Sequence, residues 1–289
     1  MKTLLVDGDN LFKIGFHGVR DFFVEGEHIG GVFHFLNTIR RQLDENEFDK
    51  VIVFWDGENN STQRRLLLPQ YKENRRSETN ELKRQSYDWQ KSRIRQYLED
   101  MFIRQICIDK SESDDLIGYY CQISHDETKT IFSSDKDLTQ LISEQVEIYS
   151  PIKKEYHKYG ERINIGNLWI PHQNVVTYKI LTGDKSDNID GILLLGEKTI
   201  SKILPEILEK TVSVSDILTT INNLTEDENL SVLYLYELLE WVNEKKYTEV
   251  FNRRPRFNPL SHLKSYDVFF GGNDFRPKDY LVHGFRPGP

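Results

Sequence analysis

The sequence has little cysteine: Cys107 and Cys121 are the only two among 289 residues. Two cysteines exclude a disulfide scaffold and a four-cysteine zinc site, so we expect reduced, buried thiols. No apolar stretch approaches the ~20 residues of a membrane span, and the first apolar run is too short for a signal sequence. These absences predict a soluble cytoplasmic protein with no membrane partner.

A surplus of positive charge is also missing. The 46 Asp and Glu outnumber the 38 Lys and Arg, which gives a formal net charge of −8. This balance at first argues against a nucleic-acid partner. The distribution weakens that objection, because residues 61–97 carry ten basic side chains and only four acidic ones.

The order of apolar segments predicts the fold class. Short apolar runs alternate with helix-like segments up to about residue 150, which indicates an α/β fold with a central, mostly parallel sheet flanked by helices. After Pro171 the pattern becomes helical. The predicted strands are 3–6, 51–55, 106–108, 130–132 and 146–149, and the predicted helices are 32–43, 87–101, 116–123, 138–142, 173–182, 198–208, 213–222 and 229–244.

Acidic residues follow one predicted strand after another. The carboxyl ends of parallel strands lie at one edge of a sheet, which is where α/β proteins bind ligands. Any one of these acids could be a turn former or a helix N-cap, but four successive strand ends with acids favour a site. With two more acids after the helix 173–182, the candidates are Asp7, Asp56, Glu112, Asp114, Asp115, Asp135, Asp137, Asp184 and Asp187.

Nine carboxylates at one edge would repel one another, so the pattern implies bound cations. Oxygen ligands without His or Cys select hard ions, which predicts Mg²⁺, with Mn²⁺ as a substitute. More than six acids suggests two or more ions, the arrangement used for phosphodiester hydrolysis.

The basic segment supplies chemistry that complements the acids. Cations near a metal-bound phosphate stabilise the charge that develops in phosphoryl transfer. Tyr71, Tyr87 and Trp89 lie among the Lys and Arg residues and are suited to stack on unpaired bases. A solvated basic helix face is the simpler alternative for this segment taken alone.

Taken together, the motifs resemble the structure-specific 5′-nuclease (flap endonuclease, 5′-3′ exonuclease) superfamily, and most closely its bacteriophage type, which includes the RNase H of T-even phages. The resemblance covers about residues 3–205 and rests on the order of the motifs, since each one is weak alone. The motifs are Asp7, Asp56, Tyr71-Lys72-x-x-Arg75, Glu112-Ser-Asp-Asp, Ser134-Asp-Lys-Asp137 and Gly183-Asp-x-x-Asp-Asn188.

This resemblance implies a PIN-like nuclease fold with two metal ions. The first ion would be held by Asp7, Asp56, Glu112, Asp114 and Asp135. The second would be held by Asp137, Asp184 and Asp187, with Asp115 shared or in the outer shell.

The resemblance also implies how nucleic acid is bound. Lys72 and Arg75 match the catalytic Lys and Arg that contact the scissile phosphate, and residues 73–100 would form an arch for a single-stranded 5′ end. A helix-hairpin-helix-like element at 183–205 would bind duplex. Leu193 and Leu194 replace its usual Pro and Gly, which argues against the family's K⁺ site. The candidate nucleic-acid contacts are Arg64, Arg76, Lys83, Arg84, Lys198 and Thr199.

We expect three regions: an α/β nuclease domain at 1–170, a helical duplex-binding region at 171–250 and a loosely ordered tail at 251–289. The expected partners are branched or 5′-ended DNA and RNA–DNA hybrids, with the tail as a candidate contact for a replication protein. We expect a monomer in the cytoplasm, which would be the host cytoplasm for a phage-encoded chain.

Other functions remain open at this point. A haloacid-dehalogenase-type phosphatase would use Asp7 as nucleophile and Asp9 as acid/base, but it leaves the other acidic motifs unexplained. A nucleic-acid-binding module that has lost catalysis would not need Mg²⁺. A small PIN-type ribonuclease would lack the basic insertion and the helical half.

Overall fold

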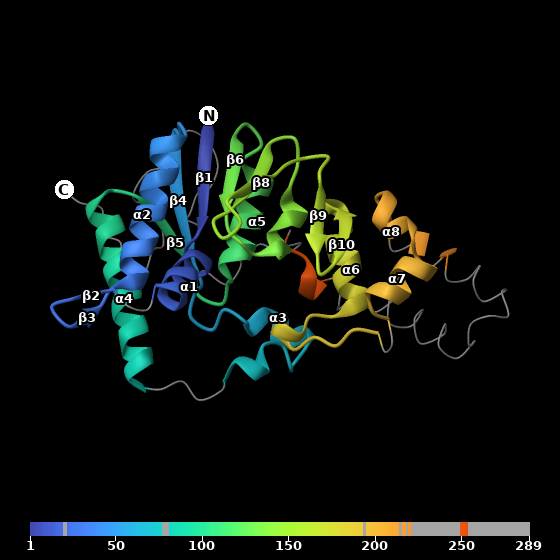
Figure 1. The fold of residues 1–289 in the computed structure, drawn as a ribbon, viewed down its shortest axis with the longest axis horizontal. Coiled ribbons are helices and arrows are strands. Elements are labelled where there is room, and N and C mark those ends of the chain that lie inside the picture. The colour runs from blue at the N-terminus through green and yellow to red at the C-terminus, as the bar shows by residue number, and fades with distance from the viewer. Residues whose placement is uncertain are drawn as a thin grey trace. The chain divides into compact units, whose positions relative to one another are not determined.

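The computed structural model describes residues 1–19, 22–76, 81–192, 195–213, 216–217, 219–220 and 249–253. Two compact units contain them: a first unit of residues 1–62 and 77–158, and a second unit of residues 63–76 and 159–253 (Figure 1). The helix predicted at 229–244 and the tail beyond residue 253 lie outside the described residues. Within the described ranges, no helix is both long and apolar enough to cross a membrane.

The first unit is built on a six-stranded sheet in the order β5-β4-β1-β6-β7-β8. The first five strands run parallel, and β8 is antiparallel to β7. The prediction of a central, mostly parallel sheet is therefore confirmed. The strands are β1 (Lys2–Asp7), β4 (Lys50–Trp55), β5 (Arg104–Cys107), β6 (Thr128–Phe132), β7 (Val146–Ser150) and β8 (Glu155–His157).

Helices cover both faces of this sheet, so successive residues of a central strand are buried on opposite sides. On one face, α1 (Gly8–Gly18), α2 (Gly30–Glu45) and α4 (Glu81–Asp100) enclose an apolar cluster that includes Val53 and Trp55. On the other face, Phe54 contacts Tyr120 of α5 (Ser113–Ile123) at a ring-centroid distance of 6.1 Å. Burial on both faces explains why the central strands β1 and β4 are apolar runs without alternation.

Three features were not predicted from the sequence. The helix α1 begins directly after β1 with no loop, so the strand and helix patterns merge there. The short hairpin of β2 (Phe23–Val24) and β3 (Glu27–His28) has too few residues for a recognisable alternation. The segment predicted as a helix at 138–142 is instead a 3-10 helix, η2 (Lys136–Leu141).

The helix α4 buries one face of its second half. From Gln90 onward it packs into the core through Ile94 and Leu98, which have no exposed surface. The buried Gln90 Oε1 accepts the N–H groups of Gly31 and Val32 at 2.9 and 3.3 Å, and so caps the first turn of α2. Residues on the other face of this half, such as Arg93 and Tyr97, are exposed, and the arch predicted at 73–100 stays a prediction.

The second unit combines a hairpin with short helices. The hairpin consists of β9 (Arg162–Ile165) and β10 (Leu168–Pro171), which pair antiparallel. Pro205 separates α7 from α8, so the helix predicted at 198–208 is divided in two. The helices are η1 (Glu73–Arg76), η3 (His172–Asn174), α6 (Val175–Thr182), η4 (Lys185–Asp187), α7 (Glu197–Ile203) and α8 (Glu206–Glu209), and α3 (Thr62–Leu67) begins at the boundary with the first unit.

A buried carboxylate stabilises the sheet at the end where β6 begins. The Glu127 carboxylate accepts hydrogen bonds from Thr3 Oγ1 and Tyr120 OH and pairs with Lys50 Nζ, each at 2.7 Å. Burial raises the pKa of Glu127, but the hydrogen bonds from Lys50, Thr3 and Tyr120 together outweigh it, so the pKa lies below its ordinary value.

We predict that Glu127→Gln lowers the free energy of unfolding at pH 7 by roughly 1–3 kcal/mol, because Lys50 loses its buried anionic partner. A carboxyl group whose pKa is lower in the folded than in the unfolded protein stabilises the fold at pH values above its unfolded-state pKa. This stabilisation is lost as the pH falls through the folded-state pKa. The difference between variant and wild type should therefore shrink below about pH 4.5. Urea unfolding at several pH values measures this, with the exposed neighbour Asp126→Asn as control. Equal stability of Glu127→Gln and wild type at pH 7 would contradict the assignment.

Candidate functional site

The first two acids lie at the ends of the central strands β1 and β4. Asp7 is 4% exposed and caps α1 by accepting the Asn10 N–H at 3.2 Å. Ser113 joins the two acids, because its hydroxyl donates to Asp7 Oδ1 at 3.2 Å and its N–H donates to Asp56 Oδ1 at 2.9 Å. A Cβ at Gly57 would lie 1.8 Å from the Ile108 carbonyl oxygen, so only glycine allows the chain to turn closely after Asp56.

The next acids follow β6 and continue the same edge. Ser133 donates its hydroxyl to Asp7 Oδ2 at 2.9 Å and accepts the Asp135 N–H at 3.0 Å. Asp135 Oδ1 in turn accepts the Asp137 N–H at 2.9 Å and caps η2. Serine side chains therefore hold Asp7 from both neighbouring acidic motifs.

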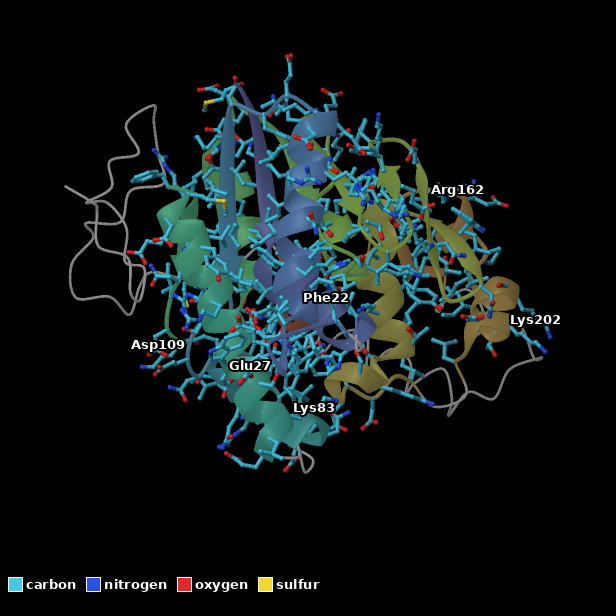
Figure 2. All side chains as sticks on the ribbon, turned by 60° about the vertical axis from the view of Figure 1, so that its left-hand side comes forward. Phe22, Glu27, Lys83, Asp109, Arg162 and Lys202 are labelled. Atoms are coloured by element: carbon cyan, nitrogen blue, oxygen red, sulfur yellow. The ribbon has the colours of Figure 1, made fainter. Side chains whose placement is uncertain are left out.

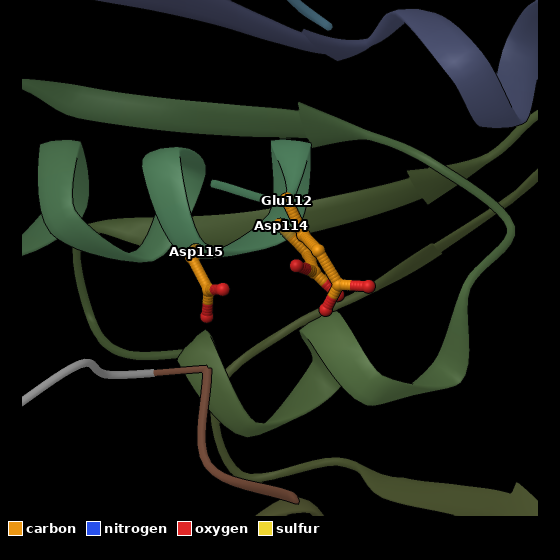
Figure 3. Close-up of side chains that lie close together, drawn as sticks. All are labelled: Glu112, Asp114 and Asp115. Carbon is orange, nitrogen blue, oxygen red and sulfur yellow. The ribbon is translucent and has the colours of Figure 1, made fainter. Parts of the chain in front are cut away.

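Three acids gather at the start of α5. Glu112, Asp114 and Asp115 are all buried, and each offers a carboxylate oxygen within 4.8 Å of the others (Figure 3). They come from the last residue before the helix and its first turn, where the helix dipole favours negative charge. The group is thus a compact, oxygen-only cluster.

The crowding of negative charge changes the proton affinity of the edge. Burial, followed by the charges of Asp135 and Asp56, raises the pKa of Asp7 to about 7. Burial also raises the pKa of Asp56, together with the charge of Asp9. A divalent cation would favour the ionised carboxylates, so these side chains suit metal binding.

Another carboxylate of this region, Asp9, has a different position from the predicted ligands. Its Oδ2 accepts the Asp56 N–H at 2.7 Å, and its Oδ1 pairs with Lys91 Nζ at 2.6 Å. Lys91 also lies 5.3 Å from the ring of Trp55. Asp9 therefore fixes the main chain of Asp56 and connects it to α4.

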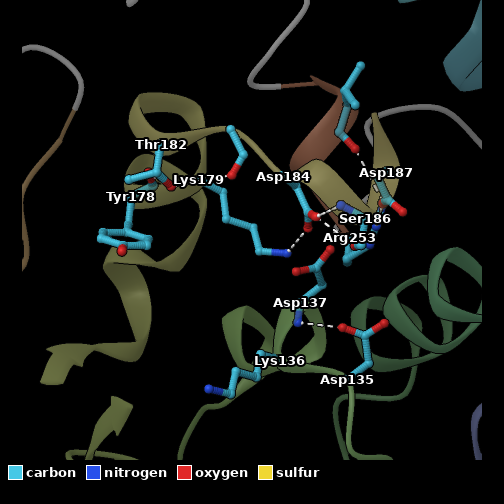
Figure 4. A network of polar contacts seen from close by, with 12 residues as sticks. Asp135, Lys136, Asp137, Tyr178, Lys179, Thr182, Asp184, Ser186, Asp187 and Arg253 are labelled. Atoms are coloured by element: carbon cyan, nitrogen blue, oxygen red, sulfur yellow. Dashed lines mark hydrogen bonds and ion pairs between the residues drawn. The ribbon is translucent and has the colours of Figure 1, made fainter. Parts of the chain in front are cut away.

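The remaining predicted ligands belong to the second unit. Asp184 Oδ2 pairs with Lys179 Nζ at 2.7 Å, and its Oδ1 accepts the N–H and hydroxyl of Ser186 at 2.8 and 2.6 Å (Figure 4). Burial raises the pKa of Asp184, but Lys179 and Ser186 outweigh this effect and lower it to about 2. Asp187 is 5% exposed and lies in the same loop.

Lys72 is anchored to that loop through its main chain. Its N–H donates to the Asp187 carbonyl oxygen at 2.8 Å, and Asn188 Nδ2 donates to the Gln70 carbonyl oxygen at 2.8 Å. Lys72 has φ = 53°, a left-handed conformation that is costly for a residue with a Cβ and often marks a functional position. Its Nζ lies 4.9 Å from the ring of the fully buried Tyr71. Tyr71 is therefore a core residue rather than a stacking platform.

The predicted nucleic-acid contacts occupy contrasting positions. Lys83 is exposed on the first turn of α4 (Figure 2). The next residue, Arg84, is also exposed, as is Lys198 at the start of α7, beside the half-buried Thr199. Arg75 and Arg76 lie in η1, and their side chains are outside the described part of the chain. Arg64, in contrast, is only 5% exposed and donates to main-chain carbonyl groups at 250 and 252. A guanidinium buried in this way does not suit the predicted phosphate contact.

The donor set of the first unit fits hard divalent cations. The side chains at the edge are carboxylates, with serine hydroxyl groups that orient them, and no His or Cys is among the predicted ligands. Oxygen ligands of this kind bind Mg²⁺ and Mn²⁺ in preference to softer metals.

A solved structure shares this architecture. The chain matches a structure described as divalent metal ions (zinc) bound to T5 5′-exonuclease, with a TM-score of 0.71, 20% identity, and coverage of 88% of this chain and 90% of that one. A second match, with a TM-score of 0.64, 19% identity and the same coverage, is bacteriophage T5 flap endonuclease in a pseudo-enzyme-product complex with DNA and metal ions. These matches establish the fold class as that of the 5′-nucleases.

Sequence comparisons identify the family. The model of the 5′-3′ exonuclease N-terminal resolvase-like domain matches residues 2–165. A 5′-3′ exonuclease of Halalkalibacterium halodurans is 30% identical over 207 residues, 68% of this chain and 67% of that protein. DNA polymerase I of Streptococcus pneumoniae is 30% identical over 214 residues, 71% of this chain but 24% of the polymerase, so this chain spans about a quarter of that relative. The chain belongs to the 5′-3′ exonuclease family, which excludes the phosphatase alternative.

The sequence did not predict the residues that hold the acidic side chains by hydrogen bonds or ion pairs. Ser113 and Ser133 stand inside the acidic motifs, so their position next to the acids was the available signal. Lys91 lies 82 residues from Asp9, and the sequence contains no local sign of their pairing.

We predict that Asp114→Asn weakens Mn²⁺ binding at least about tenfold, a change of roughly 1.4 kcal/mol, because it removes an anionic donor from the cluster at α5. Isothermal titration with MnCl₂ measures the affinity. Asp126→Asn, an exposed acid before β6, is the matched control and should bind as wild type does. Unchanged affinity in a folded Asp114→Asn would exclude Asp114 as a ligand.

Proposed function

We propose that the protein is a divalent-metal-dependent, structure-specific 5′-nuclease that hydrolyses phosphodiester bonds in branched or 5′-ended DNA. The observation that carries this proposal is the set of acids held together at the carboxyl edge of the first unit's sheet. Family membership supports it, and so does the T5 flap endonuclease complex, whose description names DNA and metal ions. RNA–DNA hybrids are a second proposed substrate, and a monomer is the proposed form.

Two Mg²⁺ ions are the proposed cofactors, with Mn²⁺ as a substitute. Asp7, Asp56, Glu112, Asp114 and Asp135 are the proposed ligands of the first ion. Asp137, Asp184 and Asp187 are those of the second, with Asp115 shared or in the outer shell. When bound, such ions lower the pKa of water and stabilise charge on attacking and leaving oxygens. A K⁺ ion is not part of the proposal.

The chain's own residues contribute binding and charge stabilisation. The Lys72 ammonium and the Arg75 guanidinium are proposed to contact the scissile phosphate and stabilise the charge that develops on it. The left-handed main chain at Lys72 and its bond to the Asp187 carbonyl support this role, because they hold the residue beside the acidic loop. The proposed further contacts with DNA are Arg76, Lys83, Arg84, Lys198 and Thr199.

Residues 73–100 are proposed to form an arch that encloses the 5′ single strand, and the first half of α4 is an exposed part of this segment. Lys83 and Arg84 lie on this half, and Trp89 is 37% exposed with Arg93 5.5 Å from its ring. Basic and aromatic groups together bind single strands through phosphate contacts and base stacking. The tail beyond residue 253, which lies outside the described residues, remains a candidate contact for a replication protein.

We predict that the protein cleaves an end-labelled 5′-flap duplex in Mg²⁺ and not in EDTA. Asp135→Asn should reduce the single-turnover rate at least about 100-fold, because it removes an anionic ligand of the proposed first ion, which would stabilise charge on the reacting oxygens. DNA affinity, measured by fluorescence anisotropy in Ca²⁺, should change little. The same assay with an RNA flap tests the hybrid substrate.

Asp126→Asn is the control for this experiment, since Asp126 precedes β6 and Asp135 follows it. Cleavage that persists in EDTA would refute metal dependence. DNA binding without cleavage in any divalent metal would instead identify an inactive nucleic-acid-binding module.

A further inference from the structure

Residues 249–253 lie outside the segment 2–165 that the family model matches, yet they are built into the core of the second unit. Val250 and Phe251 are 1% and 2% exposed. They belong to an apolar cluster with Leu68, Tyr71, Ile180 and Ile189. This cluster contains the residue before Lys72 and the residue two positions after Asp187, so the short segment packs against both of these chain segments.

Arg64 fixes the main chain of this segment. Its Nε donates to the Val250 carbonyl oxygen at 2.9 Å, and its Nη2 donates to the Asn252 carbonyl oxygen at 3.4 Å. Burying a guanidinium is costly unless its donors are satisfied. The buried position of Arg64 therefore has a function within the fold, which is to hold residues 250–252.

The last residue of the segment, Arg253, reaches the acidic loop. Arg253 is 2% exposed, its Nη1 donates to the Val250 carbonyl oxygen at 3.3 Å, and its Nη2 lies 3.9 Å from Asp187 Oδ2 (Figure 4). A guanidinium keeps its charge when buried and offers donors in a fixed planar arrangement. At this distance the contact with Asp187 is an ion pair, in which the fixed guanidinium attracts the carboxylate oxygen that faces it.

Both acids of the loop 183–188 therefore have a cation, but from different parts of the chain. Asp184 is paired with Lys179, five residues away in α6. Asp187 is paired with Arg253, 66 residues away. The Lys72 N–H already holds the main chain of Asp187. The ion pair with Arg253 acts on the Asp187 side chain.

We propose that Arg253 is a positioning residue that orients the Asp187 carboxylate for metal binding, and that Arg64 holds Arg253 in place. The proposal rests on the proposed function, in which Asp187 is a metal ligand. Arg253 touches neither substrate nor ion in this role and acts through Asp187. The segment 249–253 is thus part of the active centre although it lies outside the matched family segment.

The charge of Arg253 and its effect on the orientation of Asp187 predict opposite changes in Mn²⁺ affinity when Arg253 is replaced by methionine. Removal of a cation next to a carboxylate would, by charge alone, strengthen Mn²⁺ binding. Loss of orientation would weaken it, since residues that orient metal ligands typically contribute about 10- to 100-fold to affinity or activity. The sign of the change therefore distinguishes a positioning role from a purely electrostatic one.

The test compares Arg253→Met, Arg253→Lys and Arg64→Met with the exposed Arg162→Met on β9 as control. Titration with MnCl₂ should give about tenfold weaker binding at one site for Arg253→Met, with partial recovery in Arg253→Lys, which keeps the charge. Arg64→Met should weaken binding in the same direction. Single-turnover cleavage of a 5′-flap duplex should slow by a similar factor, while DNA affinity stays within about twofold.

Thermal unfolding checks that each variant is folded. Unchanged or tighter Mn²⁺ binding in folded Arg253→Met would overturn the proposal. If Arg253→Met does not fold, Mn²⁺ binding is compared between Arg253→Lys and wild type. Equal Mn²⁺ affinity of these two proteins would then overturn the proposal. If the wild type itself does not cleave the flap, the proposed function fails, and the Mn²⁺ titration still decides the role of Arg253.

Discussion

Repulsion among carboxylates at one edge of a sheet is the constraint on which the rest of this structure depends. Without a cation, burial and the charges of Asp135 and Asp56 raise the pKa of Asp7, and burial and the charges of Asp9 and Glu112 raise that of Asp56, so the crowding of these acids destabilises the fold. The chain holds them there with hydrogen bonds from Ser113 and Ser133 and with apolar packing on both faces of the sheet. Such stored strain is typical of sites at which a ligand is needed to balance the charge.

The same logic applies in each unit by itself. In the first unit, Asp9 is neutralised by Lys91 and binds the main chain of Asp56. In the second unit, Lys179 and Arg253 each accompany one acid of the loop 183–188. Resident cations therefore lie beside Asp9, Asp184 and Asp187. The cluster of Glu112, Asp114 and Asp115 offers oxygens close enough together for a divalent ion.

Sequence patterns predicted the sheet and most of the acids, because both depend on local signals. A buried parallel strand is an apolar run, and the residue after it lies at the ligand edge, so Asp7 and Asp56 follow from position alone. Long-range pairs left no such signal. The burial of Arg64, predicted to contact phosphate, results from residues almost 190 positions away, and the second half of α4 looked polar because only one of its faces, with Gln90, Ile94 and Leu98, is buried.

The central claim is that the acidic edge exists to bind divalent metal, and Mg²⁺-dependent stability tests it most directly. The measurement is the free energy of urea unfolding of wild type and Asp7→Asn against MgCl₂ concentration at constant ionic strength. Wild type should gain stability as RT ln(1 + [Mg²⁺]/Kd), while Asp7→Asn should gain much less. A wild type that Mg²⁺ does not stabilise, or an equal gain in both proteins, would contradict the account.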